Sequence, residues 1–226
     1  MHNVVVVGGG PAGLSAALAA AAAGAPVLLI DSNSRLGGQY WRNSSDNFDD
    51  QHEQHFDLET GLLLINAVKA RKEIEVWSDS QIWSASNSEG KFTLRIIYQG
   101  KEKIVNTANI ILCTGAYDRT LPFPGWDIPG VMTPGGVQSL LKGHGVLAGK
   151  RVVVAGTGPF LLPVAAGVIK AGGEVVSLLE ANKSRRWLTS FNVILENLGK
   201  LKEAFYYIKT ISEGKVRAKF GYAVIT

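Results

Sequence analysis

The sequence predicts an α/β protein in which two parallel-sheet units of the same design follow one another. Each unit begins with a run of valines, at residues 4–7 and 152–154, that leads directly into a glycine-rich turn. An Ala- and Leu-rich stretch suited to a helix comes next, and then a second apolar run that ends in an acid. Asp31 follows Gly8, and Glu180 follows Gly156, at nearly the same spacing. Continuous apolar runs of this length favour parallel strands that are covered on both faces.

The glycine turn of the first unit has the pattern of a dinucleotide-binding fingerprint. Gly8 permits a tight turn out of the strand, Gly10 lets the backbone approach a pyrophosphate, and Gly13 lets the helix pack closely on the strand. The helix N-terminus directs free N–H groups and a partial positive charge toward the phosphates. Asp31 then stands where a carboxylate accepts hydrogen bonds from ribose hydroxyls. Because the pattern occurs twice at matched spacing, the sequence predicts two Rossmann-like units.

The distribution of charged, aromatic and apolar residues limits the kinds of partner that the chain is expected to bind. Residues 1–139 hold 10 Lys and Arg against 14 Asp and Glu, whereas residues 140–226 hold 13 against 5. We interpret the basic half as a solvated face; the alternative is that it meets an anionic ligand or an acidic partner subunit. No basic cluster is interleaved with aromatic residues, so nucleic acid is not an expected partner. No apolar run is long enough to span a membrane.

The cysteine and histidine content argues against metal and disulfide chemistry. Cys113 is the one cysteine in the sequence, which excludes a disulfide framework, a C-x-x-C redox pair and an all-Cys iron–sulfur site within this chain. A single cysteine suits a reducing cytosol, so we expect a cytoplasmic protein. His52 and His55 lie among acids, but a solvated acidic loop is the better interpretation, and no metal site is expected.

The remaining elements follow along the chain. A helix is expected at residues 58–72, followed by three strand-like runs at 73–77, 80–86 and 91–99, which we interpret as a small three-stranded insert. Residues 108–115 are expected to form another buried strand, and residues 135–142 a short helix. Further helices are expected near 187–198 and 201–211, and residues 215–226 predict two closing strands.

This order resembles the flavoproteins with two dinucleotide-binding domains, to which thioredoxin reductase and ferredoxin reductase relatives belong. The segments RLGGQYWR, at 35–42, and LCTGAYDRTLPFPGWDIPGVMTPGGVQSLLK, at 112–142, are similar to one branch of that group. That branch comprises opine oxidase A subunits, the hydrogen cyanide synthase B subunit, and α subunits of amino-acid dehydrogenases and heteromeric sarcosine oxidase. The resemblance covers about residues 1–190.

The resemblance implies a division into domains. Residues 1–120 would form a Rossmann-like FAD-binding domain, and residues 146–226 a second, NAD-type nucleotide-binding domain. The proline-rich stretch within 121–145 would connect them. In the resembled families the chain later returns to complete the FAD domain, so we expect this chain to be C-terminally truncated and to bind flavin weakly.

The resemblance also implies which residues hold the cofactors. The FAD site would be formed by Gly8, Gly10, Pro11, Ala12, Gly13, Asp31, Ser32, Arg35, Gly38, Gln39, Ile82, Thr114 and Gly115. The second phosphate turn would be formed by Gly156, Gly158, Pro159 and Glu180.

The second turn departs from the fingerprint in two places. Leu161 replaces the third glycine, and Pro163 falls inside the expected helix, where it would break a hydrogen bond or cause a kink. Glu180 would favour NAD(H), because a carboxylate repels a 2′-phosphate, although Arg185 and Arg186 lie nearby in sequence. A functional NAD(H) site and a vestigial unit both remain open.

The resemblance predicts an FAD-dependent oxidoreductase subunit that works with a second flavoprotein subunit on a C–N bond of an opine or amino acid. A stand-alone NAD(P)H-dependent flavin reductase, lacking a redox C-x-x-C, is the first alternative. A non-catalytic assembly subunit that binds adenine nucleotides is the second. No general base stands out in the sequence, so no catalytic residue is named.

Overall fold

The computed structural model describes residues 2–42, 58–183 and 198–225. Its described residues form two compact units, the first reaching residue 116 and the second beginning at residue 117. No helix in these described ranges is long and apolar enough to cross a membrane.

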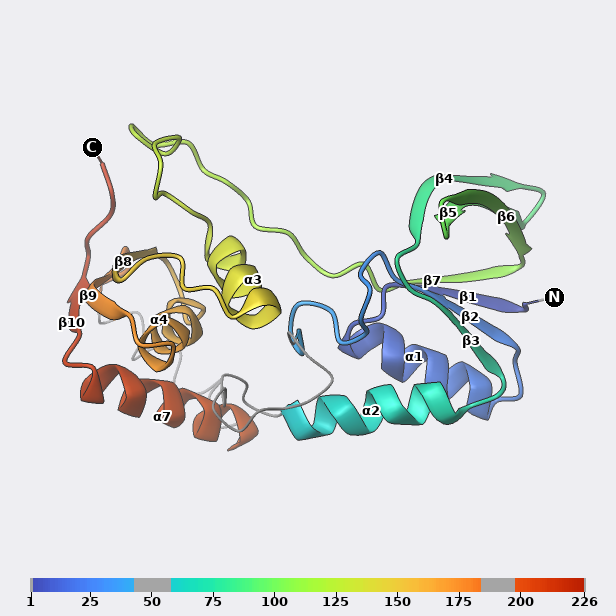
Figure 1. Cartoon of the computed structure of the whole chain (residues 1–226), viewed down its shortest axis with the longest axis horizontal. Helices are drawn as coiled ribbons and strands as arrows, with labels where there is room; N and C mark the ends of the chain where they lie inside the picture. The colour runs from blue at the N-terminus through green and yellow to red at the C-terminus, as the bar shows by residue number, and fades with distance from the viewer. Residues whose placement is uncertain (1, 43–57, 184–197, 226) are drawn as a thin grey trace. The chain divides into compact units, whose positions relative to one another are not determined.

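A four-stranded parallel sheet forms the centre of the first unit (Figure 1). In spatial order its strands are β3 (Ile74–Trp77), β2 (Val27–Ile30), β1 (Val4–Val7) and β7 (Asn109–Leu112). Helices α1 (Pro11–Ala22) and α2 (Leu58–Ala70) pack beside one another on this sheet. The alternation of strand and helix produces the parallel pairing that the sequence predicts.

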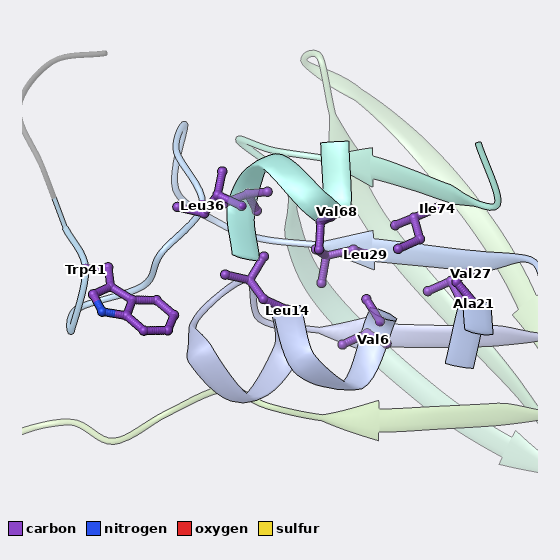
Figure 2. Packing of buried hydrophobic residues seen from close by; sticks show 11 residues of the cluster. Val6, Leu14, Ala21, Val27, Leu29, Leu36, Trp41, Val68 and Ile74 are labelled. Carbon is purple, nitrogen blue, oxygen red and sulfur yellow. The ribbon is translucent and has the colours of Figure 1, made fainter. Parts of the chain in front are cut away.

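Both faces of the two central strands, β1 and β2, are buried. Val6 and Leu29 belong to the cluster that packs against Leu14 of α1 and Val68 of α2, as Figure 2 shows. Alternate residues such as Val5 and Leu28 belong to a second cluster, shared with an antiparallel sheet. Burial on two sides explains why the strand sequences are continuously apolar rather than alternating.

The antiparallel sheet corresponds to the predicted three-stranded insert, but two of its three strands are the predicted ones and the third is not. Its strands are β4 (Gln81–Ser88), β5 (Lys91–Tyr98) and β6 (Lys101–Thr107), joined by tight turns. The run at 73–77, expected in this insert, is instead β3 of the parallel sheet. Strand β6 went unrecognised, because its first four residues are exposed and only Val105 and Thr107 are buried.

Strand β7 is less buried than its apolar sequence predicts. It pairs with β1 through one edge, and Leu112 is 74% exposed. Within the described residues no strand pairs with the other edge of β7. The expectation of a buried strand was therefore wrong for this chain, since an outer strand has a neighbour on one side only.

A three-stranded parallel sheet forms the centre of the second unit. Its strands, in spatial order, are β10 (Arg217–Phe220), β9 (Glu174–Glu180) and β8 (Arg151–Gly156). Its core combines side chains from β8 and β9 with α3 (Pro134–His144), α4 (Leu161–Lys170) and α7 (Leu198–Glu213), whereas all four residues of β10 are exposed. Within residues 215–225 one strand forms, β10, where two closing strands were expected. The helix expected near 187–198 falls almost wholly outside the described residues.

Helix α3 lies within the stretch expected to be a connector. The hydroxyl oxygen of Thr133 accepts a hydrogen bond from the Gly136 amide at its N-terminus, and Gly145 ends the helix in a left-handed conformation. Val137 is buried in the core of the second unit. This part of the segment is therefore packed structure of the second unit.

Candidate nucleotide-binding sites

The first glycine turn depends on glycine for its packing. The Gly8 amide donates to the carbonyl oxygen of Ile30 at 2.7 Å, and the residue has a φ of +104°. A Cβ added at Gly8 would lie 2.2 Å from the carbonyl oxygen of Cys113, and one added at Gly13 would lie 1.7 Å from that of Gly8. Strand β1, helix α1 and the end of β7 can therefore approach this closely only if both positions are glycine.

Gly10 is a glycine of a different kind. Its φ of −78° is open to any residue, and the nearest atom to an added Cβ is the Cα of Gly38, at 3.7 Å. Gly38 itself has a φ of +61°, and its own Cβ would lie 2.9 Å from the Cα of Gly10. Two backbone segments without side chains thus face one another here, and we call this pair the glycine cradle.

The segment that contains Gly38 is fastened in place by packing. Trp41 is 4% exposed, and its ring covers Gly61 of α2 so closely that a Cβ there would lie 2.5 Å from it (Figure 2 shows Trp41 and Leu36 in the cluster). The Gly37 amide donates to the carbonyl oxygen of Gly9 at 2.8 Å. These contacts position the predicted loop at 35–42 against the fingerprint.

Helix α1 begins with unused donors. The Leu14 amide donates to the carbonyl oxygen of Gly10 at 2.9 Å, whereas the amides of Ala12 and Gly13 make no hydrogen bond to the described part of the chain. Pro11, at the first helical position, has no N–H to satisfy. The helix N-terminus next to the cradle therefore offers two N–H groups and a partial positive charge to an anion.

Asp31 is buried directly beneath the turn, with 5% exposure. Its carboxylate accepts from the Gly9 amide at 2.5 Å, from the Asn33 amide at 2.7 Å and from the Asn33 side chain at 2.8 Å. An ionised carboxylate can accept about four hydrogen bonds, so one position remains for a further donor. The predicted hydrogen bond to a ribose remains a prediction.

The other predicted residues of the first site fall into two groups. Two hydrogen bonds hold residues 113–116 beside the turn. The Cys113 amide donates to the carbonyl oxygen of Val7, and the Gln39 side chain donates to the carbonyl oxygen of Ala116 at 3.3 Å. Thr114 and Gly115 follow there. Ser32 and Arg35 are exposed beyond β2, and Ile82 is partly buried against the insert core. Strand β4, which carries Ile82, begins near the acid, because the Ser80 amide donates to the backbone oxygen of Asp31 at 2.9 Å.

Sequence reasoning missed Gly9 and Asn33. A Cβ at Gly9 would lie 2.5 Å from Leu36 and 2.9 Å from the Asp31 carboxylate, so glycine lets the turn close over the acid. The signal for Asn33 is a repeat, because each acid is followed two residues later by asparagine, in Asp31-Ser-Asn33 and Glu180-Ala-Asn182.

In the second unit the acid is fully enclosed. Glu180 is 0% exposed, and its carboxylate accepts from the Gly158 amide at 2.9 Å and from the Thr157 hydroxyl at 3.1 Å. Asn182 adds its amide at 2.8 Å and its side chain at 3.0 Å. Burial raises the pKa of the Glu180 carboxyl, but the hydrogen bonds from Asn182, Gly158 and Thr157 outweigh it and hold the pKa below 4.5.

Leu161, in place of the third glycine, changes how the second helix begins. A Cβ on Gly156 would lie 3.1 Å from the Leu161 side chain, which is buried in the core. Helix α4 begins at Leu161, whereas α1 begins at Pro11, three residues after Gly8. Pro163 consequently lies in the first turn of α4, where a missing N–H costs little, so the expected break within the helix was wrong. Arg185 and Arg186 lie outside the described residues.

Comparison with known proteins agrees with the resemblance found in the sequence. The A subunit of opine oxidase from Agrobacterium tumefaciens (strain Ach5) is 33% identical over 189 residues, which cover 81% of this chain and 37% of that protein. Hydrogen cyanide synthase subunit HcnB from Pseudomonas protegens is 36% identical over 186 residues, covering 79% and 38%. The chain thus spans less than two fifths of the length of these relatives.

The fold is shared with a solved dehydrogenase structure. The L-proline dehydrogenase from P. horikoshii superposes with a TM-score of 0.65 at 23% sequence identity, covering 79% of this chain and 35% of that one. Residues 2–192 match the family model described as pyridine nucleotide-disulphide oxidoreductase. With most of its length covered by that model, the chain belongs to the pyridine nucleotide-disulphide oxidoreductase family.

Proposed function

We propose that this chain is the FAD-binding part of an oxidoreductase subunit that acts, with a partner, on the C–N bond of an opine or amino acid. The observation that carries the cofactor assignment is the glycine cradle between Gly10 and Gly38. The substrate class rests on the names of the relatives, which are subunits of opine oxidase and hydrogen cyanide synthase.

The residues around the cradle fit the pyrophosphate of FAD. Side chains are missing on both sides, at Gly10 and Gly38, so two backbone segments can close on the phosphates. The amides of Ala12 and Gly13 are the donors that the phosphates would take up. The remaining acceptor position of Asp31 suits a ribose hydroxyl.

The bound flavin would supply the two-electron chemistry, while the protein supplies position and electrostatics. Residues at the ends of β1, β2 and β7 would do that work, because ligands of parallel sheets bind at the carboxyl ends of the strands. We place Thr114 and Gly115 on the pyrophosphate side, Gln39 near the middle of the cofactor, Ser32 and Arg35 toward the adenosine, and Ile82 against the adenine.

A second flavoprotein subunit is the proposed partner, and it would bind and oxidise the amine. Both relatives are named as subunits, which supports a heteromeric assembly. On this proposal the present chain passes electrons rather than contacting the amine, which agrees with the lack of an obvious general base in its sequence.

The substitution Gly10→Ala tests the cradle. The φ of Gly10 accepts alanine and the added Cβ meets nothing closer than 3.7 Å, so the fold should survive. The same methyl would stand where the pyrophosphate must approach. We expect the affinity for FAD, measured by quenching of flavin fluorescence, to fall at least about tenfold, which corresponds to about 1.4 kcal/mol.

Gly149→Ala is the matched control, because its Cβ also has its nearest contact at 3.7 Å, with Val152 in the second unit. FAD should bind this variant as it binds the unchanged chain. Equal FAD affinity in the Gly10→Ala and Gly149→Ala variants would contradict the proposed site.

A further inference from the structure

The two glycine turns differ in the groups that a dinucleotide would contact. In the first turn the glycine that donates its amide to the acid is Gly9, one residue before Gly10. In the second turn it is Gly158, which is the counterpart of Gly10 itself. The Gly158 amide is therefore already used in the second unit, whereas the Gly10 amide makes no hydrogen bond to the described part of the chain.

One helix donor that is open in the first turn is also used in the second. The amide of Leu161, the counterpart of Gly13, donates to the carbonyl oxygen of Gly158 at 3.3 Å. The Phe160 amide, the counterpart of Ala12, makes no hydrogen bond to the described part of the chain. The second turn therefore offers one such amide where the first offers two, because without the third glycine the helix starts only at Leu161.

The carboxylate of Glu180 is enclosed more tightly than that of Asp31. It takes four hydrogen bonds, one on Oε2 from the Gly158 amide and three on Oε1 from Thr157 and Asn182, whereas Asp31 takes three. The acceptor positions of Oε1 are thereby filled, and the residue is 0% exposed. A ribose hydroxyl could reach Glu180 only if the surrounding chain opened, which would leave buried polar groups unpaired.

We propose that Thr157, Glu180 and Asn182 form a structural clasp that takes the place of a dinucleotide site, so that NADH does not bind the second unit. The consequence for electron flow rests on the proposed function: the flavin of the first unit would receive its electrons from the partner subunit, not from NADH. Of the two interpretations that the sequence leaves open, the clasp selects the vestigial unit.

Equilibrium dialysis of the purified chain against NADH tests the clasp directly. We expect no saturable retention of NADH up to about 1 mM, the upper end of ordinary substrate affinities. Saturable retention that the Glu180→Gln variant lowers severalfold would overturn the proposal, because it would place NADH on the enclosed carboxylate.

Retention of NADH that Gly10→Ala abolishes and Glu180→Gln leaves unchanged would place NADH in the first turn. That result would keep the clasp and contradict the proposed function, so the two failures are distinguishable. Dialysis against FAD in the same samples reports on the first unit independently.

A stability measurement tests the clasp without any nucleotide. Asn182→Ala removes two of the four donors to Glu180 and should lower the urea midpoint of the second unit. Asn33→Ala is the matched variant, since Asn33 makes the same pair of bonds to Asp31, and it should act on the first unit alone. An unchanged midpoint in Asn182→Ala would overturn the clasp.

Discussion

Single glycines in this chain have separate physical tasks. Gly8 and Gly13 permit close packing of strand on helix, Gly10 and Gly38 form the cradle in which we propose that a pyrophosphate binds, and Gly9 lets the turn close over Asp31. The sequence indicated the first two tasks through the spacing of the fingerprint. It carried no sign of the close approach between Gly10 and Gly38, because those residues meet only after the loop at 35–42 has folded back.

The difference between packing and binding glycines predicts opposite effects of the same methyl group. Gly13→Ala would put a Cβ 1.7 Å from the Gly8 carbonyl oxygen, so strand and helix must separate. We expect the first unit to lose about 3 kcal/mol or more of unfolding free energy, measured by urea denaturation. Gly10→Ala should keep its stability, and a Gly13→Ala variant of unchanged stability would refute the packing.

The buried carboxylate of Glu180 should make the second unit less stable in acid. Its pKa is lower in the folded chain than the ordinary 4.5, so the folded state favours the carboxylate. The stability it contributes is complete above pH 4.5 and is lost as the pH falls below 4.5, through the folded pKa. Glu180→Gln should flatten this dependence and cost about 2 kcal/mol at pH 7 in urea unfolding. An acid limb of equal steepness in the variant would exclude Glu180 as its source.

Among the helices and strands, the sequence predicted best those strands whose residues are buried on both faces of the sheet. Residues 4–7 and 27–30 are buried on both faces, and their apolar runs indicate this directly. Strand β6 escaped because it is mostly exposed and begins Lys-Glu-Lys. Strand β3 was assigned to the wrong sheet, since a short strand beside a hairpin carries no signal of which neighbour it will pair with.

A lysine on helix α3 should make the second unit more stable as the pH rises into the alkaline range. Lys142, on α3, lines a small cavity with Gln138 and Pro163, and burial lowers the pKa of its ammonium to about 8, against an opposing attraction from Glu203. Below pH 8 the folded and unfolded chains are both protonated and the burial cost is complete. Between pH 8 and 10.5 the unfolded chain binds more protons, so stability should rise with pH.

Lys142→Met should remove this rise and stabilise the second unit at pH 7 by about 2 kcal/mol in urea unfolding. Lys150→Met, at an exposed position, is the control and should keep the rise. A Lys142→Met variant whose stability still climbs between pH 8 and 10.5 would show that another group titrates there.

At the scale of the whole molecule, two units of one design have taken different forms. Each has its own core, its own parallel sheet and an acid held beneath a glycine turn. The sequence predicted this duplication and, through Leu161 and Pro163, the point at which the second copy departs. It could not predict the clasp, because the enclosure of Glu180 depends on side-chain geometry at the ends of β8 and β9.

The assignment of FAD to the first turn and of no dinucleotide to the second is tested most directly by the visible absorption spectrum of the purified chain saturated with FAD, before and after NADH is added without oxygen. We expect a bound-flavin spectrum that NADH leaves unchanged, because on these proposals the first turn holds the cofactor and the second is closed. Bleaching of the flavin by NADH, or the absence of any bound flavin at saturating FAD, would contradict this assignment.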